Sequence, residues 1–427
     1  MAKSVVIVGG GVIGLSIAYY ALRAGHRVTL VERGGPDRDN CSLGNAGMIV
    51  PSHFVPLAAP GMVGLGLRML LNPEGPFALR PRPSLSLLRW GAAFCRSANA
   101  PHVARSAPLL RDLSLQSRRL FEELADEWGD KFGLTRRGLL MLCKTERALH
   151  EEAELAKTAR ALGLSADVLT PEEAARLDPG GPRLDIAGAV YFSHDCHLSP
   201  ARFVAALTRE VEKNGATLCW NTPVTGWRTS STDGNIVAVR TTAGDLSADE
   251  YVLAGGAWSA RIVRDLPGAD ILLQAGKGYS VTLPRPKNRP GICSILTEAR
   301  VAVTPMLAPA MGESLRFAGT MEIGGLDLSV NRRRVAGMFR SIPRYFPDFG
   351  PGDFAGLPVW SGFRPCSPDG LPYVGRFKRH PNLCVATGHA MMGVSLAPVT
   401  GRLVADLLSG TPPALDIAAL RPDRFAR

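Results

Sequence analysis

The pattern of apolar and polar residues predicts a strand–helix–strand unit at the start of the 427-residue chain. An apolar run at 5–8 is followed by glycines, and apolar residues then continue at helical spacing through 15–24. Gly25 is suited to end this helix, and a second apolar run at 27–31 supplies the next strand. We therefore expect a complete βαβ unit within residues 1–32.

The remainder of the chain mixes helical and strand patterns. Further helices are expected at 106–128, 146–162, 200–214 and 336–345, with another starting at Thr170-Pro171. Strands are expected at 138–143, within 216–254, and at 271–283 and 300–321, and 383–408 should form a strand, a tight turn and a helix. This mixture predicts an α/β nucleotide-binding domain interleaved with a second domain that contains a sheet.

Three glycines after the first strand form the dinucleotide-binding fingerprint Gly9-x-Gly11-x-x-Gly14. Gly9 permits the tight turn, Gly11 lets the backbone approach a pyrophosphate, and Gly14 lets the helix pack closely on the strand. The N-terminus of the helix offers free N–H groups and a partial positive charge to the phosphates. The unit therefore predicts a bound dinucleotide.

The end of the second strand carries Glu32, which is placed to accept hydrogen bonds from the ribose hydroxyls. Arg33 follows it, but the carboxylate at position 32 argues against a 2′-phosphate and so against NADP. Within this unit nothing distinguishes FAD from NAD(H). An NAD-dependent dehydrogenase therefore remains open at this point.

Composition and charge exclude some classes of function. The net charge is +11, but there is no compact Lys/Arg block, so a nucleic acid partner is not favoured. The eight cysteines contain no C-x-x-C pair, which favours buried thiols in a reducing compartment over disulfides or a metal site. No secretory signal precedes the first strand, and no apolar run reaches the roughly 18 residues that span a bilayer. We expect a cytoplasmic protein without a metal.

Residues 54–95 differ in amino-acid composition from the rest of the chain. They are rich in Leu, Met and Phe with interspersed arginines, and Glu74 is their only acidic residue. Such a segment is suited to a membrane interface, which would place the protein peripherally on the inner face of the cell membrane, within reach of a quinone. A lid or a subunit interface in an oligomer would have the same composition. The membrane interpretation and the protein-covered interpretation therefore both stay open.

Four further stretches of sequence bear on the identity of the cofactor. They lie at 41–48, at 252–259, at 360–365 followed by 369–375, and at 387–398. Together with the N-terminal unit they resemble the FAD-dependent D-amino-acid oxidase superfamily, which includes glycine oxidase and sarcosine oxidase. The resemblance covers essentially the whole chain, and residues 42–47 and 277–280 are most similar to bacterial D-amino-acid dehydrogenases. It implies FAD as the cofactor.

The resemblance also implies a fold. A Rossmann-like, glutathione-reductase-like FAD-binding domain is expected to be interleaved with a mixed-sheet α+β substrate domain. We assign 1–55, 163–262 and 358–427 to the FAD-binding domain, and 56–162 and 263–357 to the substrate domain, with the basic-apolar insert at 54–95.

The same resemblance implies a set of FAD contacts. Small residues in 42–48 would let backbone amides reach the isoalloxazine ring, and the turn after 388 would face the pyrimidine edge of the reduced ring. The implied cofactor-binding residues are Gly9, Gly11, Val12, Ile13, Gly14, Glu32, Arg33, Ser42, Asn45, Ala46, Gly47, Met48, Val224, Gly255, Gly256, Trp258, Gly362, Gly388, Met391, Met392, Gly393, Val394 and Ser395.

The substrate-carboxylate arginine of the family falls on Arg364. A guanidinium holds a carboxylate with two parallel hydrogen bonds and fixes its orientation. Tyr279, Lys277 and His389 are further candidates for the pocket, although each could equally be structural. The strand at 300–304 lacks the active-site tyrosine of the family, and Met391 stands where glycine oxidase has an arginine. Glycine is therefore not the expected substrate.

The expected reaction is hydride transfer from the α-carbon of a D-amino or cyclic imino acid to flavin N5, with electrons passed on to a quinone-type acceptor. The segment 390–395 resembles relatives associated with hydroxyproline breakdown, so cis-4-hydroxy-D-proline is the leading individual candidate. Two alternatives remain. One is an amino-acid oxidase that uses oxygen, and the other is an FAD-binding subunit of a hetero-oligomeric amine dehydrogenase.

Overall fold

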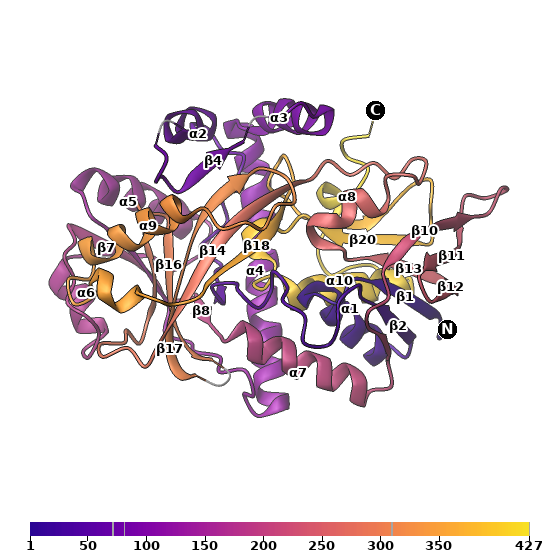
Figure 1. Ribbon diagram of the computed structural model, residues 1–427, viewed down its shortest axis with the longest axis horizontal. Helices are drawn as coiled ribbons and strands as arrows, with labels where there is room; N and C mark the ends of the chain where they lie inside the picture. Colours follow the sequence, from indigo (N-terminus) through magenta and orange to yellow (C-terminus); the bar gives the residue numbers. More distant parts are fainter. Residues whose placement is uncertain (71, 81, 309–310, 427) are drawn as a thin grey trace.

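The computed structural model describes residues 1–70, 72–80, 82–308 and 311–426 (Figure 1). Within these residues the strands form two large sheets, which lie side by side in Figure 1, and two smaller sheets. The N-terminal βαβ unit belongs to one large sheet, and most of residues 270–323 belong to the other.

The first large sheet carries the dinucleotide unit. Its strand order across the described residues is β19 (Tyr373–Arg376), β20 (Leu383–Thr387), β13 (Glu250–Leu253), β1 (Ser4–Val8), β2 (Arg27–Val31) and β9 (Thr217–Cys219). Only β19 runs antiparallel to its neighbour. In β1, Val5 and Ile7 pack into one core cluster while Val6 and Val8 pack into another. Because both faces are buried, the strand is apolar throughout rather than alternating.

Helices cover one face of this sheet and a small sheet covers the other. The helices are α1 (Val12–Arg23), α4 (Ala100–Trp128), α7 (Pro200–Lys213) and α10 (Ala397–Ser409), whose apolar residues share one cluster with Val5 and Ile7. The opposite face packs against β10 (Val224–Thr229), β11 (Ile236–Thr241) and β12 (Gly244–Leu246), and against the short α8 (Ser259–Ile262) and the segment after it. The result is a three-layer arrangement, which agrees with the Rossmann-like nucleotide-binding domain expected from the sequence.

The second large sheet is mixed. The order in the described chain is β18 (Val359–Cys366), β14 (Gln274–Pro284), β17 (Gly312–Ile323), β16 (Val301–Ala308), β15 (Cys293–Leu296), β5 (Leu139–Cys143), β7 (Gly188–Phe192) and β6 (Asp167–Leu169), with β4 (Phe77–Leu79) paired to β17. Helices α5 (Glu146–Ala161), α6 (Pro171–Leu177) and α9 (Arg332–Ser341) lie over this part of the molecule (Figure 1).

The sheet pairing corrects the domain boundaries expected from the sequence. The strands β6, β7 and β18 were assigned to the FAD-binding domain, but all three belong to the second large sheet. The reason is non-local pairing, since β7 is fully paired to β5 and β18 to β14. The FAD-binding sheet therefore resumes only after β8 (Cys196–His197), which pairs with β3 (Met48–Ile49).

The expected helices are present, with shifted ends. The helix expected at 106–128 starts at Ala100, because the side chain of Asn99 accepts a hydrogen bond from the backbone of His102. The helix expected at 336–345 is α9, which starts at Arg332 because Asn331 caps it in the same way. Its last expected residues form a separate 3₁₀ turn.

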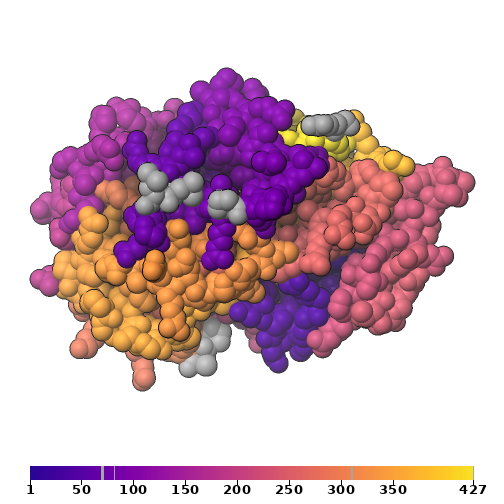
Figure 2. Space-filling view, turned by 45° about the horizontal axis from the view of Figure 1, so that its top comes forward, coloured from indigo at the N-terminus to yellow at the C-terminus, as the bar shows by residue number. Residues whose placement is uncertain are grey.

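The basic-apolar segment lies on the surface. It forms α2 (Met62–Leu70), β4 and α3 (Leu85–Ser97), which occupy the upper middle of the face shown in Figure 2, in dark purple. Trp90 of α3 is buried and donates a hydrogen bond to the carbonyl of Cys366. Leu67, Leu85 and Leu88 are 61%, 73% and 70% exposed, so part of the apolar face is not covered by this chain. In the described residues, no helix has the length and apolarity needed to cross a bilayer.

Candidate active site

A cavity of about 880 Å³ opens at the carboxyl ends of β1, β2 and β13. Parallel α/β sheets place ligands at this edge. The cavity extends from Glu32 to β18 and to the turn before α10. The predicted residues that line it are Gly9, Gly11, Val12, Ile13, Glu32, Arg33, Ser42, Asn45, Val224, Gly255, Gly256, Trp258, Gly362, His389, Gly393 and Val394.

The three fingerprint glycines have separable roles. Gly9 has φ +114°, and a β-carbon there would lie 2.4 Å from the carbonyl oxygen of Ala254. A β-carbon on Gly14 would lie 1.9 Å from the carbonyl oxygen of Gly9. A β-carbon on Gly11 would meet only the Ser42 hydroxyl, at 3.8 Å. Gly9 and Gly14 are therefore required by the fold, whereas Gly11 leaves open space that faces the cavity.

Glu32 is held by the glycine turn. Its carboxylate accepts hydrogen bonds from the backbone N–H of Gly10 at 2.8 Å and of Gly34 at 3.0 Å. A second residue here, Arg38, has no signal in the sequence pattern. Its guanidinium lies 3.8 Å from the Glu32 carboxylate, donates to the carbonyl of Gly10 and stacks on the ring of Trp220. Arg38 thus links the glycine turn to the strand end that carries Glu32.

Arg33, the residue after Glu32, lies at the wall of the cavity. Its guanidinium carbon is 3.7 Å from the ring centre of Trp258. Such a contact is a cation–π interaction. Both residues line the cavity. Gly256, beside Trp258, has φ +54°.

The loop at 42–48 is fixed by local polar contacts. The Ser42 hydroxyl accepts a hydrogen bond from the N–H of Val12 at the start of α1. Asn45 accepts from the N–H of Gly47 and donates to the carbonyl of Met391. Arg316, which the sequence pattern did not single out, donates to the carbonyls of two loop residues, Leu43 and Asn45. The loop is therefore tied to α1, to the turn before α10 and to β17.

Not every predicted residue of this loop lines the cavity. A β-carbon on Gly47 would lie 2.2 Å from the carbonyl oxygen of Leu198, and Met48 is buried in β3. Both, like Ala46, pack toward the protein. Gly362 in β18 lies beside the ring of Trp360, which also covers Gly44.

The turn between β20 and α10 is the tight turn expected between a strand and a helix, and two of its residues have positive φ. Gly388 has φ +79° and Ala390 has φ +47°. His389 is 3% exposed, bonds through Nε2 to the hydroxyl of Thr400, and has its pKa lowered to about 3 by burial. It is therefore neutral. Gly393 and Val394 face the cavity.

Three other predicted residues of this turn point elsewhere. Met391 is 47% exposed at the surface, and Met392 packs against the protein core. The Ser395 hydroxyl accepts a hydrogen bond from the N–H of Val50. Ser395 thus joins this turn to the strand end that follows the 42–48 loop.

Arg364 lies in β18 between Phe363 and Pro365, which line the cavity, but Arg364 itself is not among the lining residues. Its Nη1 donates to the carbonyl of Thr320 at 2.5 Å, and its Nη2 lies 3.5 Å from the carbonyl of Gly319. Burial lowers the pKa of this guanidinium. An arginine side chain is not deprotonated in proteins, so the group carries a positive charge. Among the described residues no carboxylate pairs with it. A guanidinium has five N–H donors, so this cation has capacity left for an anion.

Tyr279 and Lys277 are buried beside this region but do not line the cavity. The Tyr279 hydroxyl donates to Glu322 at 2.5 Å and accepts from the N–H of Asn331. Lys277 donates to the carbonyl of Ser329. These contacts hold the loop that precedes α9, whose Leu328 does line the cavity.

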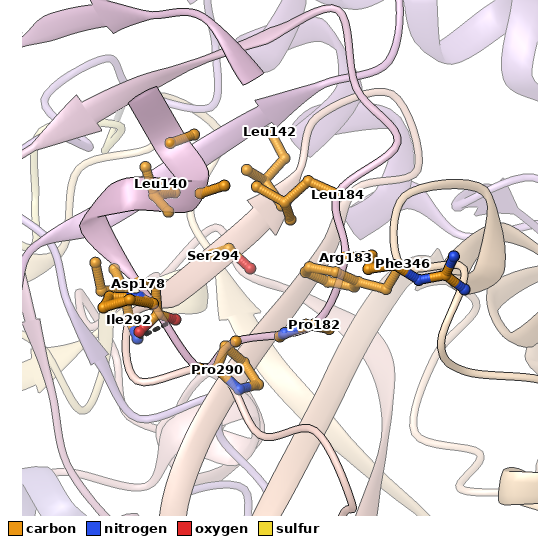
Figure 3. A pocket seen from close by; sticks show the side chains of 15 residues that line it. Leu140, Leu142, Asp178, Pro182, Arg183, Leu184, Pro290, Ile292, Ser294 and Phe346 are labelled. Carbon is orange, nitrogen blue, oxygen red and sulfur yellow. Dashed lines mark hydrogen bonds between the residues drawn. The ribbon is translucent and has the colours of Figure 1, made fainter. Parts of the chain in front are cut away.

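A second, smaller cavity of about 240 Å³ lies in the other domain (Figure 3). Leucines 140, 142 and 184 and Phe346 form its apolar wall, and Asp178 is at its edge. No predicted site residue lines it. Since pockets for drug-sized ligands hold roughly 300–1,000 Å³, it is too small for a dinucleotide.

The large cavity suits FAD on observations independent of any relative. Its volume is that of a cofactor pocket, the space beside Gly11 is open for a pyrophosphate, and Glu32 is fixed at the end of β2. Phe363 and Pro365 of β18 also line this cavity, and they flank the uncompensated cation Arg364 in the strand.

Comparison with known proteins agrees with this site. A family model described as FAD dependent oxidoreductase matches residues 4–407. The chain is 32% identical to D-amino acid dehydrogenases from Granulibacter bethesdensis and Bradyrhizobium diazoefficiens, with 99% of each chain covered. The crystal structure of glycine oxidase from Geobacillus kaustophilus superposes with a TM-score of 0.77 at 27% identity, covering 99% of both chains.

The chain therefore belongs to the family of FAD-dependent oxidoreductases, and its cofactor is FAD. This confirms the cofactor, the resemblance and the class of fold expected from the sequence.

Proposed function

We propose that this protein oxidises the α-carbon–nitrogen bond of a D-amino acid or a cyclic imino acid. The observation that carries the proposal is Arg364, a partly buried cation flanked in β18 by two cavity-lining residues, which pairs with no carboxylate in the described chain. The full-length similarity to proteins named D-amino acid dehydrogenase supports the same class of substrate.

The residues of the chain would bind and orient the substrate. Arg364 would hold the carboxylate with two parallel hydrogen bonds, which fixes the α-carbon relative to the cofactor. Bound FAD supplies the hydride acceptor at its N5 position. The predicted contacts of the 42–48 loop and of Gly393 and Val394 would position the ring, and the N-terminal end of α10 would stabilise negative charge on it. His389 is neutral and would act by packing rather than by proton transfer.

Cis-4-hydroxy-D-proline is the individual substrate we propose. The segment 390–395 resembles relatives associated with hydroxyproline breakdown, and this resemblance supports the choice. A cyclic imino acid would yield a cyclic imine, and a primary amino acid would yield an imine that water hydrolyses to a keto acid and ammonia.

The proposed electron acceptor is a quinone, reached at a membrane surface. Exposed leucines on α2 and α3 lie among the exposed arginines Arg68, Arg82 and Arg96, which is the composition of an interfacial helix. The same segment contacts β18 through the hydrogen bond from Trp90 to Cys366, and other residues of β18 line the cavity.

An anaerobic screen tests the proposed reaction. The FAD-loaded protein is mixed with D- and L-amino acids, glycine, sarcosine and the isomers of proline and 4-hydroxyproline, and bleaching of the flavin absorbance is followed. Reduction by a D-amino or cyclic imino acid at a single-turnover rate that matches steady-state turnover supports the proposal. No reduction by any of them contradicts it and favours an FAD-binding subunit. Stoichiometric peroxide in air would instead indicate an oxidase.

A further inference from the structure

Thr320 in β17 has a backbone conformation that its side chain disfavours. Its φ is +63°, in the left-handed region where glycine is usual and a β-branched residue is a true outlier. It lies in a bulge, because one residue of β14, Gly278, faces two residues of β17, Thr320 and Met321. Bulges of this kind place glycine at the left-handed position and re-aim groups beside active sites.

The bulge aims the Thr320 carbonyl at Arg364. The carbonyl oxygen accepts the hydrogen bond from Arg364 Nη1 at 2.5 Å. Gly278, on the facing strand, makes room for the same guanidinium, because a β-carbon there would lie 2.2 Å from Nη1. The orientation of Arg364 is therefore set by a missing side chain on one strand and a strained backbone on the other.

Glycine would give the same carbonyl orientation without strain, so the threonine side chain needs its own explanation. Thr320 is 8% exposed, and its hydroxyl has no hydrogen-bond partner in the described residues. Strained conformations that persist in a fold cluster at functional sites. A buried hydroxyl without a partner is also costly unless a ligand satisfies it.

We propose that Thr320 is a positioning residue for Arg364 and that its hydroxyl donates a hydrogen bond to the substrate carboxylate. The second part rests on the proposed function, because it needs a carboxylate at Arg364. Thr320 would then give the carboxylate a third donor beside the two from the guanidinium, and so restrict the rotation of the carboxylate group.

Binding of a simple carboxylate tests the proposal without turnover. The Kd of benzoate is measured from the change in the flavin spectrum of the FAD-loaded protein. Thr320→Val keeps the shape and removes the hydroxyl, and we expect a Kd about tenfold higher, the effect of losing one hydrogen bond to a charged group. Thr320→Ser should restore binding. Thr320→Gly should also raise the Kd, because it removes the hydroxyl. It should raise the melting temperature as well, because the backbone strain is relieved.

Thr304→Val is the matched control. Thr304 is also buried with an unpartnered hydroxyl, but it lies in β16 and does not contact Arg364, so its substitution should leave the Kd unchanged. The inference is overturned if Thr320→Val and Thr320→Gly both bind benzoate with the Kd of the wild type while Arg364→Met raises that Kd. If benzoate binding weakens in the Thr320 variants but no amino or imino acid reduces the flavin, the inference stands and the proposed function fails.

Discussion

A β-carbon added to Gly14 would lie 1.9 Å from the carbonyl oxygen of Gly9, so these two residues of the glycine turn are in direct backbone contact. Gly11, between them in the sequence, contacts nothing closer than 3.8 Å in the same test. The fingerprint therefore combines two residues that the fold needs with one that leaves open space at the cavity.

Gly11→Ala and Gly14→Ala should consequently fail in different ways. Gly14→Ala forces the helix from the strand and should destabilise the apoprotein by about 1–3 kcal/mol or prevent folding. Gly11→Ala should fold with a wild-type melting temperature as apoprotein and bind FAD more weakly, since its methyl group enters the space for the pyrophosphate. Thermal melts of apoprotein and titration with FAD separate the two effects. Equal losses of stability in both variants would contradict this assignment.

His389 should make the fold sensitive to acid. Burial lowers its pKa from 6.5 to about 3, so the unfolded chain takes up a proton that the folded chain refuses. Its stabilising contribution is therefore complete above pH 6.5 and is lost as pH falls toward 3, at about 1.4 kcal/mol per pH unit.

The measurement is urea unfolding of the wild type and of His389→Gln, whose amide can still bond to Thr400. Between pH 6.5 and 5.0 the wild type should lose about 2 kcal/mol more than the variant. Identical pH dependence would show that His389 is not the neutral buried group described above.

The surface formed by α2 and α3 should bind anionic membranes. Leu85→Ser combined with Leu88→Ser removes two of the most exposed apolar side chains and should reduce flotation with phosphatidylglycerol vesicles at low salt. Leu177→Ser combined with Val237→Ser removes exposed apolar residues on other elements, α6 and β11, and should leave flotation unchanged. Failure of the wild type to float at low salt would exclude the membrane proposal.

Local patterns predicted the parts of this site that depend on local geometry. The spacing of Gly9, Gly11 and Gly14 determines a turn within a few residues, so the sequence is sufficient to predict it. Glu32 follows from the length of the βαβ unit. The class of fold could also be predicted, because apolar runs and helical periodicity alternate along the chain.

The contacts that could not be predicted join residues that are distant in sequence. Arg316 holds the 42–48 loop, and Arg38 reaches back to the glycine turn, and nothing next to either residue indicates its partner. The membership of β7 and β18 in the second sheet is likewise set by long-range pairing. The strain at Thr320 has no sequence signal, because glycine rather than threonine marks such a position.

The central claim is that Arg364 binds the carboxylate of an amino or imino acid substrate. The most direct test measures anaerobic flavin reduction by the substrate found in the screen and by its carboxamide. Both compounds are tested on the wild type and on Arg364→Met, and Arg289→Ala is the control. The wild type and Arg289→Ala should prefer the acid by roughly 100-fold, the effect of two charge-assisted hydrogen bonds. Arg364→Met should retain FAD and lose that preference. An undiminished preference for the acid in Arg364→Met would contradict the account.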